Sequence, residues 1–216
     1  MKTLIQCDFD GTITDQDVSF LLLDNFADKS WRQLLKEHAE GRISVGTFNR
    51  MAFAMIKADK QTLLNFVLNS GKIKIRPGFS ELLSYCTRNS LEFVIISNGQ
   101  DFYIDAMLKN LGINNIRYYS AKSRFTPEGI AVNYIGPDGR IMEDSFKETY
   151  ARIFLEKGYR LIYAGNGLSD MNPARHAYHV FAIGKLLKLC RKEKLNCTPF
   201  NDLNDIVRGL KLLQPG

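Results

Sequence analysis

The chain has 216 residues, enough for one core domain of ordinary size with a modest insertion. Hydrophobic residues make up 45% and charged residues 24%, which is typical of a soluble globular protein and argues against disorder. No apolar run reaches the length of a membrane span, and only a very short apolar stretch precedes Asp8. We therefore expect no signal peptide and a cytoplasmic protein.

Lysines and arginines outnumber the acidic residues and give a formal net charge of +6, but they are scattered without a dense run. This pattern indicates a solvated surface with mild attraction for anionic small molecules, and we expect neither nucleic acid nor a membrane as a partner. The four cysteines show no CxxC spacing, which disfavours a zinc site and predicts free thiols.

Two carboxylates follow the first predicted strand. Thr3–Cys7 is short, mostly apolar and partly β-branched, as expected for a buried strand, and Asp8 and Asp10 come directly after it. The two aspartates can converge on one small volume at the strand's end, where Gly11 loosens the backbone. Because like charges so close repel, the pair predicts a cation or a shared proton. An Asp-rich turn that caps a helix is the alternative.

Residues 17–72 differ in character from the rest of the chain. Apolar residues recur there at helical spacing, which predicts a bundle of helices inserted between the first and second strands. We expect 17–72 to form a separate helical unit, which the resemblance described below implies is a cap, and 1–16 together with 73–216 to form the core. Asp15, Arg42 and Arg50 are the candidate substrate contacts near or within the cap.

The second strand also ends in polar side chains. An amphipathic helix over 79–89 precedes Phe93–Ile96, a near-continuous apolar run typical of a parallel strand covered on both faces. Ser97 and Asn98 follow, and in a parallel sheet a hydroxyl at this strand end belongs beside Asp8. The alternative is that Ser97 caps the helix expected over 100–111.

The middle of the chain predicts a strand over 116–119 and, between two turn signals, a small hairpin on the rim around 130–134. A helix over 146–158 follows, with Ser145 as its N-cap and Glu148 completing a capping box. Lys147 lies on its first turn. Taken alone, a lysine on such a helix is usually only solvated.

That next strand, Arg160–Ala164, leads into a glycine-containing turn from which Asn166 and Asp170 can both face the crevice at the strand's end. A last strand over 180–183 and helices over 186–194 and 202–213 complete the chain. We therefore expect an α/β fold with a doubly wound parallel sheet, the first strand at its centre and the site outside the carboxyl ends of the strands.

The stretch DFDGT at 8–12, the Ser97 strand end, Lys147 and the 165–170 turn together resemble the four motifs of the haloacid dehalogenase (HAD) superfamily. The resemblance implies a HAD-like Rossmannoid core under a cap that closes over the site and selects the substrate. It implies Asp8 as the nucleophile that forms an aspartyl-phosphate, and Asp10 as the acid that protonates the leaving group and the base that activates water.

The same resemblance implies the remaining ligands. A phosphoryl group would be bound by Ser97, Asn98, Lys147 and Thr12, and Mg²⁺ by Asp8, Asp10, Asn166 and Asp170. The family usually has an aspartate where Asn166 stands. An amide oxygen can still bind Mg²⁺, although the site then carries one negative charge fewer.

Stretches around 101–104, 168–174 and 190–200 resemble one branch of the superfamily, which contains the methionine-salvage phosphatase acting on 2-hydroxy-3-keto-5-methylthiopentenyl-1-phosphate and adjoins phosphoserine phosphatase. The sequence thus predicts a Mg²⁺-dependent phosphomonoesterase for a small phosphorylated metabolite. The alternatives are a phosphotransferase or mutase with the same site and a phospho-ligand binding protein weakened by Asn166. A dehalogenase is disfavoured, because halide displacement from carbon needs no Asp10 acid.

Overall fold

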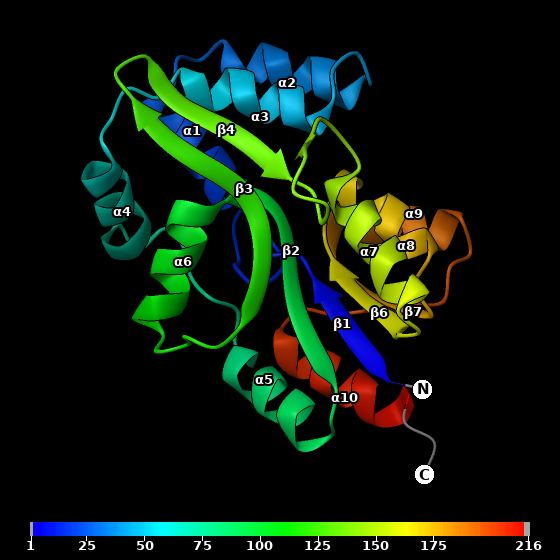
Figure 1. The fold of residues 1–216 in the computed structure, drawn as a ribbon. Helices are drawn as coiled ribbons and strands as arrows, with labels where there is room; N and C mark the ends of the chain where they lie inside the picture. Colours follow the sequence, from blue (N-terminus) through cyan, green and yellow to red (C-terminus); the bar gives the residue numbers. More distant parts are fainter. Residues whose placement is uncertain (1, 214–216) are drawn as a thin grey trace.

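The structure, a computed structural model, describes residues 2–213 and is built on one mostly parallel sheet (Figure 1). Its strands are β1 (Thr3–Cys7), β2 (Glu92–Gln100), β3 (Arg117–Thr126), β4 (Gly129–Ile135), β5 (Ile141–Met142), β6 (Arg160–Gly165), β7 (His179–Ala182) and β8 (Cys197–Pro199). In space they run β5-β4-β3-β2-β1-β6-β7-β8. The pairs β3–β4 and β4–β5 are antiparallel, and the other pairs are parallel.

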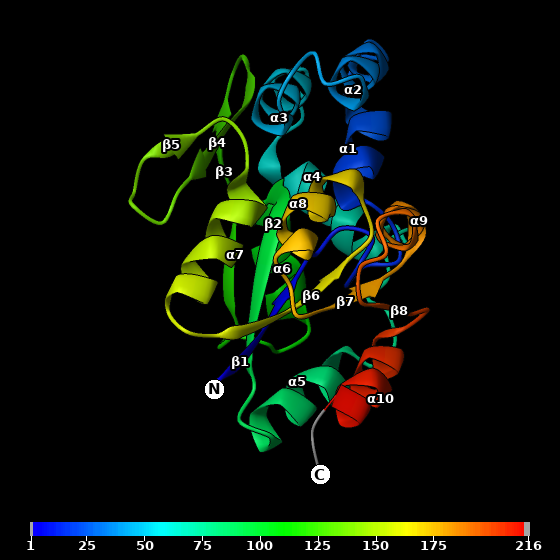
Figure 2. The ribbon, with the colours of Figure 1, turned by 90° about the vertical axis from the view of Figure 1, so that its right-hand side faces the viewer.

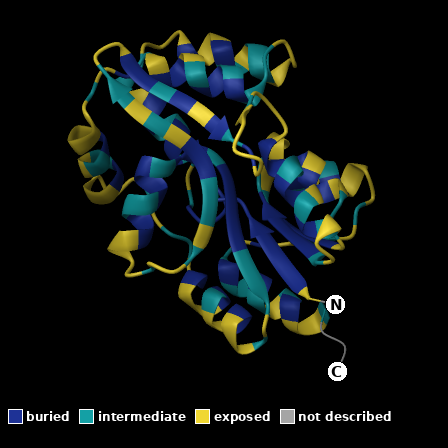
Figure 3. Ribbon diagram, viewed as in Figure 1, coloured by how far each residue is buried: buried dark blue, intermediate teal, exposed yellow. Residues whose placement is uncertain are grey.

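Burial on both faces explains why the central strands are continuous apolar runs. Leu4 and Ile5 of β1 are fully buried, and Figure 3 shows β1 and the middle of β2 in the buried colour. Ile5 lies opposite Phe93 of β2 on one side and Ile162 of β6 on the other. Because this register aligns the carboxyl ends of the three strands, the polar residues that follow them meet at one edge of the sheet.

Helices cover both faces of the sheet. The helices of the core are α5 (Phe79–Arg88), α6 (Asp101–Asn110), α7 (Phe146–Glu156), α8 (Met171–Arg175), α9 (Gly184–Lys192) and α10 (Leu203–Leu213), with the 3₁₀ turn η1 (Leu168–Asp170) before α8. The chain moves outward from β1 to β3 and then back across β1 toward β8, so right-handed crossovers place α5 and α6 on one face and α7 and α8 on the other. The predicted α/β, doubly wound fold is confirmed.

Four helices lie between β1 and β2 in the chain: α1 (Val18–Phe26), α2 (Trp31–Ala39), α3 (Val45–Ala54) and α4 (Lys60–Asn69). Figures 1 and 2 show α1, α2 and α3 beyond the carboxyl ends of β1 and β2. Three of these helices begin at a side chain that accepts a backbone N–H, namely Asp17, Ser44 and Asp59. The predicted insertion of helices after the first strand is therefore confirmed.

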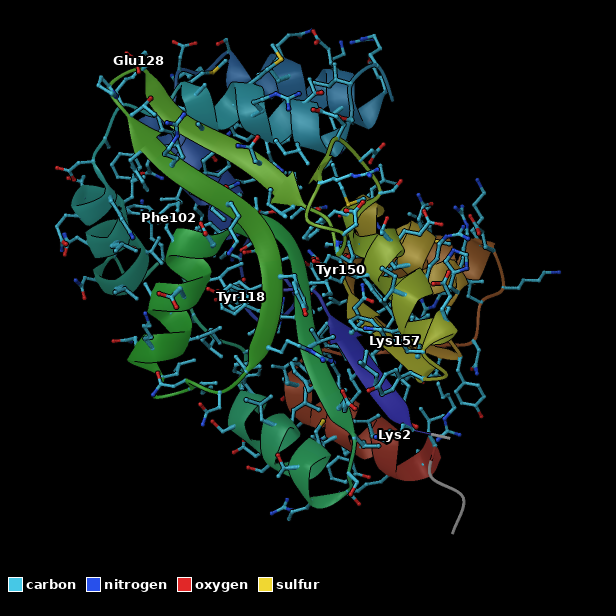
Figure 4. All side chains as sticks on the ribbon, in the orientation of Figure 1. Lys2, Phe102, Tyr118, Glu128, Tyr150 and Lys157 are labelled. Carbon is cyan, nitrogen blue, oxygen red and sulfur yellow. The ribbon has the colours of Figure 1, made fainter. Side chains whose placement is uncertain are left out.

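The hairpin expected on the rim is larger than predicted. β3 runs on to Thr126 and pairs with β4 from Lys122 opposite Asn133 to Thr126 opposite Gly129. β4 packs along α3, and Glu128, labelled in Figure 4, marks the hairpin turn beside the inserted helices. Because the hairpin and the helices share a surface, the division into a cap of 17–72 and a core of the remaining residues stays a prediction.

Two smaller observations complete the fold. All four cysteines, Cys7, Cys86, Cys190 and Cys197, are free thiols, as predicted. Within residues 2–213, none of the helices combines the length and the apolar character that crossing a bilayer requires.

Candidate active site

A cavity of about 410 Å³ opens where β1, β2 and β6 end. Its floor contains six of the predicted site residues: Asp8 and Asp10 after β1, Ser97 and Asn98 on β2, Lys147 on α7 and Asn166 after β6. Thr12 and Asp170 are fully buried and do not line it. The structure thus brings all eight predicted residues together, but two of them lie behind the floor.

Lys147 joins the first and last of the predicted motifs. Its Nζ lies 2.7 Å from Asp8 Oδ1 and 2.7 Å from Asp170 Oδ1, and its side chain is only 3% exposed. The main-chain carbonyl of Lys147 accepts a hydrogen bond from Gln6 Nε2 of β1 at 2.9 Å, which fixes the start of α7 beside the strand. The alternative of a solvated lysine is therefore wrong, because the ammonium is buried between two carboxylates.

Both carboxylate oxygens of Asp170 accept hydrogen bonds from other groups of the protein. Its Oδ1 accepts from Lys147 and from Tyr163 Oη at 2.6 Å, and its Oδ2 accepts from the N–H groups of Asn166 and Gly167 at 2.9 and 2.8 Å. Four donors occupy the lone pairs of one carboxylate. Both oxygens of Asp170 are therefore engaged by donors of the protein, and its role in holding Mg²⁺, directly or through water, stays a prediction.

Asp8 keeps one oxygen for the cavity. Within residues 2–213 its hydrogen bonds end on Oδ1, which accepts from Lys147 and from the N–H of Phe9 at 2.8 Å. The second oxygen, Oδ2, accepts none of these hydrogen bonds and is the atom that can act as a nucleophile.

Asp10 is held from the opposite side of the floor. Its Oδ2 accepts a short hydrogen bond from the hydroxyl of Tyr103 on α6 and a longer one, 3.4 Å, from Ser19 Oγ on α1. Sequence reasoning missed both Tyr103 and Tyr163. The available signal was chemical, because a tyrosine in an otherwise apolar segment needs a partner for its hydroxyl.

Ser97 lies within β2, which continues to Gln100, and its Oγ accepts from the N–H of Gly99 at 3.0 Å. The alternative in which Ser97 caps the next helix is wrong, because α6 begins only at Asp101. Asn98 lines the cavity, and its carbonyl accepts from Tyr134 Oη at 2.6 Å.

Thr12 contacts another predicted ligand and not the cavity. Its hydroxyl donates to Asn166 Oδ1 at 3.1 Å. Gly11 has a φ of +71°, and a Cβ at this position would collide with the Asn166 side chain, so the turn after Asp10 requires glycine. Thr12 therefore orients Asn166, which differs from its predicted contact with phosphate.

Several buried carboxyl groups surround the ammonium group of Lys147 at the floor. Burial, reinforced by the charge of Asp170, raises the pKa of Asp8 to about 7 despite Lys147. Burial and the charge of Asp17 raise the pKa of Asp10 as well. Burial alone would lower the pKa of Lys147, but the attraction of Asp170 and Asp8 outweighs burial and raises it. At Asp170, burial alone would raise the pKa, but the attraction of Lys147 outweighs burial and lowers it.

This donor set fits a hard cation. Among residues 2–213, no three side chains of His, Cys, Asp or Glu are grouped to hold a metal. Mg²⁺ does not require such a group, since it usually takes one or two carboxylates, other oxygen donors and several waters. Asp8 and Asn166 provide a carboxylate and an amide oxygen at the floor, and a divalent cation there would offset the surplus of buried carboxylates.

The inserted segment forms the far wall of the cavity. Its apolar members are Phe20, Leu35, Ala39, Val45 and Phe48, and its polar members are Asp17, Ser19, His38 and Asn49. The ring of His38 stacks on Phe48 at 5.7 Å, and its Nδ1 lies 3.1 Å from the carbonyl oxygen of Ile43.

None of the three predicted substrate contacts, Asp15, Arg42 and Arg50, lines the wall. Asp15 accepts from the N–H of Lys74, Arg42 pairs with Glu40, and Arg50 pairs with Glu143. These contacts already satisfy the charges, so the prediction was wrong for all three residues.

Comparisons with known proteins agree with this geometry. The profile of the haloacid dehalogenase-like hydrolase family matches residues 5–175. The chain is similar to proteins named 2-hydroxy-3-keto-5-methylthiopentenyl-1-phosphate phosphatase. One, from Exiguobacterium sibiricum, is 29% identical over 98% of this chain and 97% of its own length. Another, from Bacillus thuringiensis, is 27% identical over 99% of this chain and 98% of its own length.

Solved structures give the same fold. A phosphoserine phosphatase from T. onnurineus has a TM-score of 0.70 at 17% identity and covers 98% of this chain and 95% of its own. A phosphoserine phosphatase described as a phospho-aspartyl intermediate analogue has a TM-score of 0.68 at 18% identity, covering 96% and 98%. The family predicted from the sequence is confirmed, and the chain belongs to the haloacid dehalogenase-like hydrolase family.

Proposed function

We propose that this protein hydrolyses a small phosphomonoester in a Mg²⁺-dependent reaction that passes through an aspartyl-phosphate on Asp8. The observation that carries the proposal is the buried bridge from Asp8 through Lys147 to Asp170, with Asp10 at the same cavity floor. A nucleophile, an acid or base and a fixed positive charge are thus directed at one volume.

In the first step, Asp8 Oδ2 attacks phosphorus, the ester P–O bond breaks, and Asp10 gives its proton to the departing alkoxide. In the second step, Asp10 takes a proton from water, the resulting hydroxide attacks phosphorus, and the bond between Asp8 and phosphorus breaks to release phosphate. Lys147 and the Ser97 hydroxyl stabilise the phosphoryl oxygens throughout. Asp170 holds the lysine in place.

Mg²⁺ would be held by Asp8, Asn166 and, by the family resemblance, the main-chain carbonyl of Asp10. The ion would supply positive charge that neutralises the phosphoryl oxygens and the surplus carboxylates. Asp170 contributes to this site indirectly, through Lys147 and the backbone of the 166–167 turn.

The cavity wall supports a leaving group with an apolar part. Phe20, Leu35, Val45 and Phe48 offer little to a strongly hydrated group, whereas burial of an alkyl or thioether chain against them is favourable. The two bacterial relatives are named for a substrate with a methylthiopentenyl chain, which is the kind of leaving group that this wall suits.

The test is a phosphomonoester panel that includes alkyl phosphates, phosphoserine and phosphoethanolamine, assayed for released phosphate with Mg²⁺ and with chelator. We expect Mg²⁺-dependent turnover that favours apolar leaving groups and disappears in Asp8→Asn. Turnover that survives in Asp8→Asn or in chelator would refute the proposal.

A further inference from the structure

One buried hydroxyl next to the proposed acid is not used by the mechanism above. Tyr103 lies on the first turn of α6 and is fully buried. Its ring packs at 5.3 Å against Phe102, which Figure 4 labels on α6, and at 6.5 Å against Phe9. Because the ring is held on two sides, the position of its hydroxyl is fixed.

That hydroxyl joins three elements of the chain. Tyr103 Oη donates to Asp10 Oδ2 after β1, and it lies 2.9 Å from Ser19 Oγ on α1. Ser19 also donates to the same Asp10 oxygen at 3.4 Å. Both hydroxyls therefore act on Oδ2, and within residues 2–213 the buried Oδ1 of Asp10 has no hydrogen-bond partner.

β2 is shaped to admit this contact. A Cβ at Gly99 would collide with both the Tyr103 hydroxyl and Asp10 Oδ2. Glycine at this position lets the strand pass directly beside the hydrogen bond, so the arrangement depends on β2 as well as on α6 and α1.

Resting on the function proposed above, we infer that Tyr103, assisted by Ser19, is a positioning residue that anchors Asp10 by Oδ2 and leaves Oδ1 as the oxygen that exchanges the proton. A carboxyl group anchored by one oxygen is restrained from turning, and its other oxygen, Oδ1, accepts no hydrogen bond from residues 2–213 and so remains able to carry the proton. Because Ser19 lies on the inserted helix α1, the position of that helix is linked directly to the alignment of the acid.

The inference predicts a dependence on the leaving group. An alkoxide needs a proton as it departs, whereas p-nitrophenolate leaves without one. In Tyr103→Phe, which keeps the ring and removes the hydroxyl, kcat/KM for n-butyl phosphate should fall by about tenfold or more beyond any loss with p-nitrophenyl phosphate. This expected loss is a part of the roughly 10²–10⁴-fold rate acceleration that a general acid contributes. The value of kcat/KM reports only the steps up to release of the alcohol, so the later use of Asp10 as a base does not enter.

Three variants accompany the test. Asp10→Asn removes the acid completely and shows how kcat/KM for the two substrates then changes. Ser19→Ala should also lower kcat/KM selectively for n-butyl phosphate, but to a smaller extent. Tyr163→Phe removes an equally buried hydroxyl that serves Asp170, and should lower kcat/KM for both substrates to a similar extent.

The outcomes separate the two proposals. A wild-type protein that hydrolyses neither substrate would refute the proposed function, and this inference with it. An active wild-type protein whose Tyr103→Phe and Ser19→Ala variants lose activity equally with both substrates would overturn the inference alone. A selective loss with n-butyl phosphate, and an unchanged ratio in Tyr163→Phe, would support it.

Discussion

Replacing Lys147 by methionine should cost the protein much of its stability at neutral pH. The ammonium is 3% exposed and lies 2.7 Å from an oxygen of Asp8 and 2.7 Å from an oxygen of Asp170. At an effective dielectric constant of 20, each contact corresponds to about 6 kcal/mol of Coulomb attraction before the cost of burial is subtracted. Removing one partner from a buried ion pair typically costs about 3–5 kcal/mol, because the other charge stays buried and uncompensated.

The loss should also depend on pH with a defined sign. Without the ammonium, the pKa of Asp8 rises further above its value in the unfolded chain, so the folded state binds a proton that the unfolded state does not. A carboxyl whose pKa is raised on folding lowers stability as pH increases. The deficit of Lys147→Met should therefore be largest above pH 7 and shrink as the solution is acidified.

Urea denaturation of both proteins in metal-free buffer, at pH 8 and at pH 5.5, measures this effect. Lys157→Met is the matched control, since Lys157 lies exposed just beyond the end of the same helix, as Figure 4 shows. The double variant Lys147→Met/Asp170→Asn should recover part of the stability, because it also removes a stranded charge. A loss below about 1 kcal/mol, typical of an exposed ion pair, or the same loss at both pH values, would refute the buried bridge.

Three further predictions concern the metal and the cavity wall. The increase in Tm caused by Mg²⁺ should fade below the Asp8 pKa of about 7, with about tenfold weaker binding per pH unit, and a shift independent of pH would exclude Asp8 as a ligand. Asn166→Asp should lower the Mg²⁺ concentration that half-activates the enzyme, measured by titration; an unchanged midpoint would mean that the amide oxygen already suffices. Leu35→Asn should reduce kcat/KM about tenfold for n-butyl phosphate but not for methyl phosphate, whose leaving group is too short for the wall, and equal losses would argue against an apolar subsite.

The sheet and the polar residues at its edge could be predicted from the sequence, because both depend on local patterns of residues. A short apolar strand followed at once by Asp8 and Asp10 fixes where the carboxylates lie once the strand is buried in a parallel sheet. Ser97 was placed by the same logic, since parallel strands end at one edge of the sheet, whereas Lys147 was placed by its resemblance to the third motif of the family.

Predictions from local sequence patterns were wrong where long-range packing determines the structure. The capping box expected at Ser145 and Glu148 does not form, because Ser145 has a φ of +59° and Glu148 accepts hydrogen bonds from Arg152 and lies 2.9 Å from His176. The length of β3 was underestimated, because the charged residues on its exposed face hide the alternation of a strand that is buried on one side.

The hydrogen-bond partners of the site residues could not be predicted from spacing. Asp170 lies 23 positions from Lys147, and Tyr103 lies 93 from Asp10. Such pairs are set by how helices cross the sheet. The residues of the cavity wall could not be predicted either, because helix packing, and not composition, determines which side chains of 17–72 face the cavity.

The central claim is that Asp8 carries the phosphoryl group during turnover, and its most direct test is peptide mass spectrometry of enzyme quenched in acid while hydrolysing p-nitrophenyl phosphate with Mg²⁺. We expect a phosphoryl group on the peptide that contains Asp8, released by hydroxylamine as an acyl phosphate would be, and more abundant in Asp10→Asn because that variant lacks the base for its hydrolysis. Full turnover without any such adduct, or an adduct on a different residue, would contradict the account.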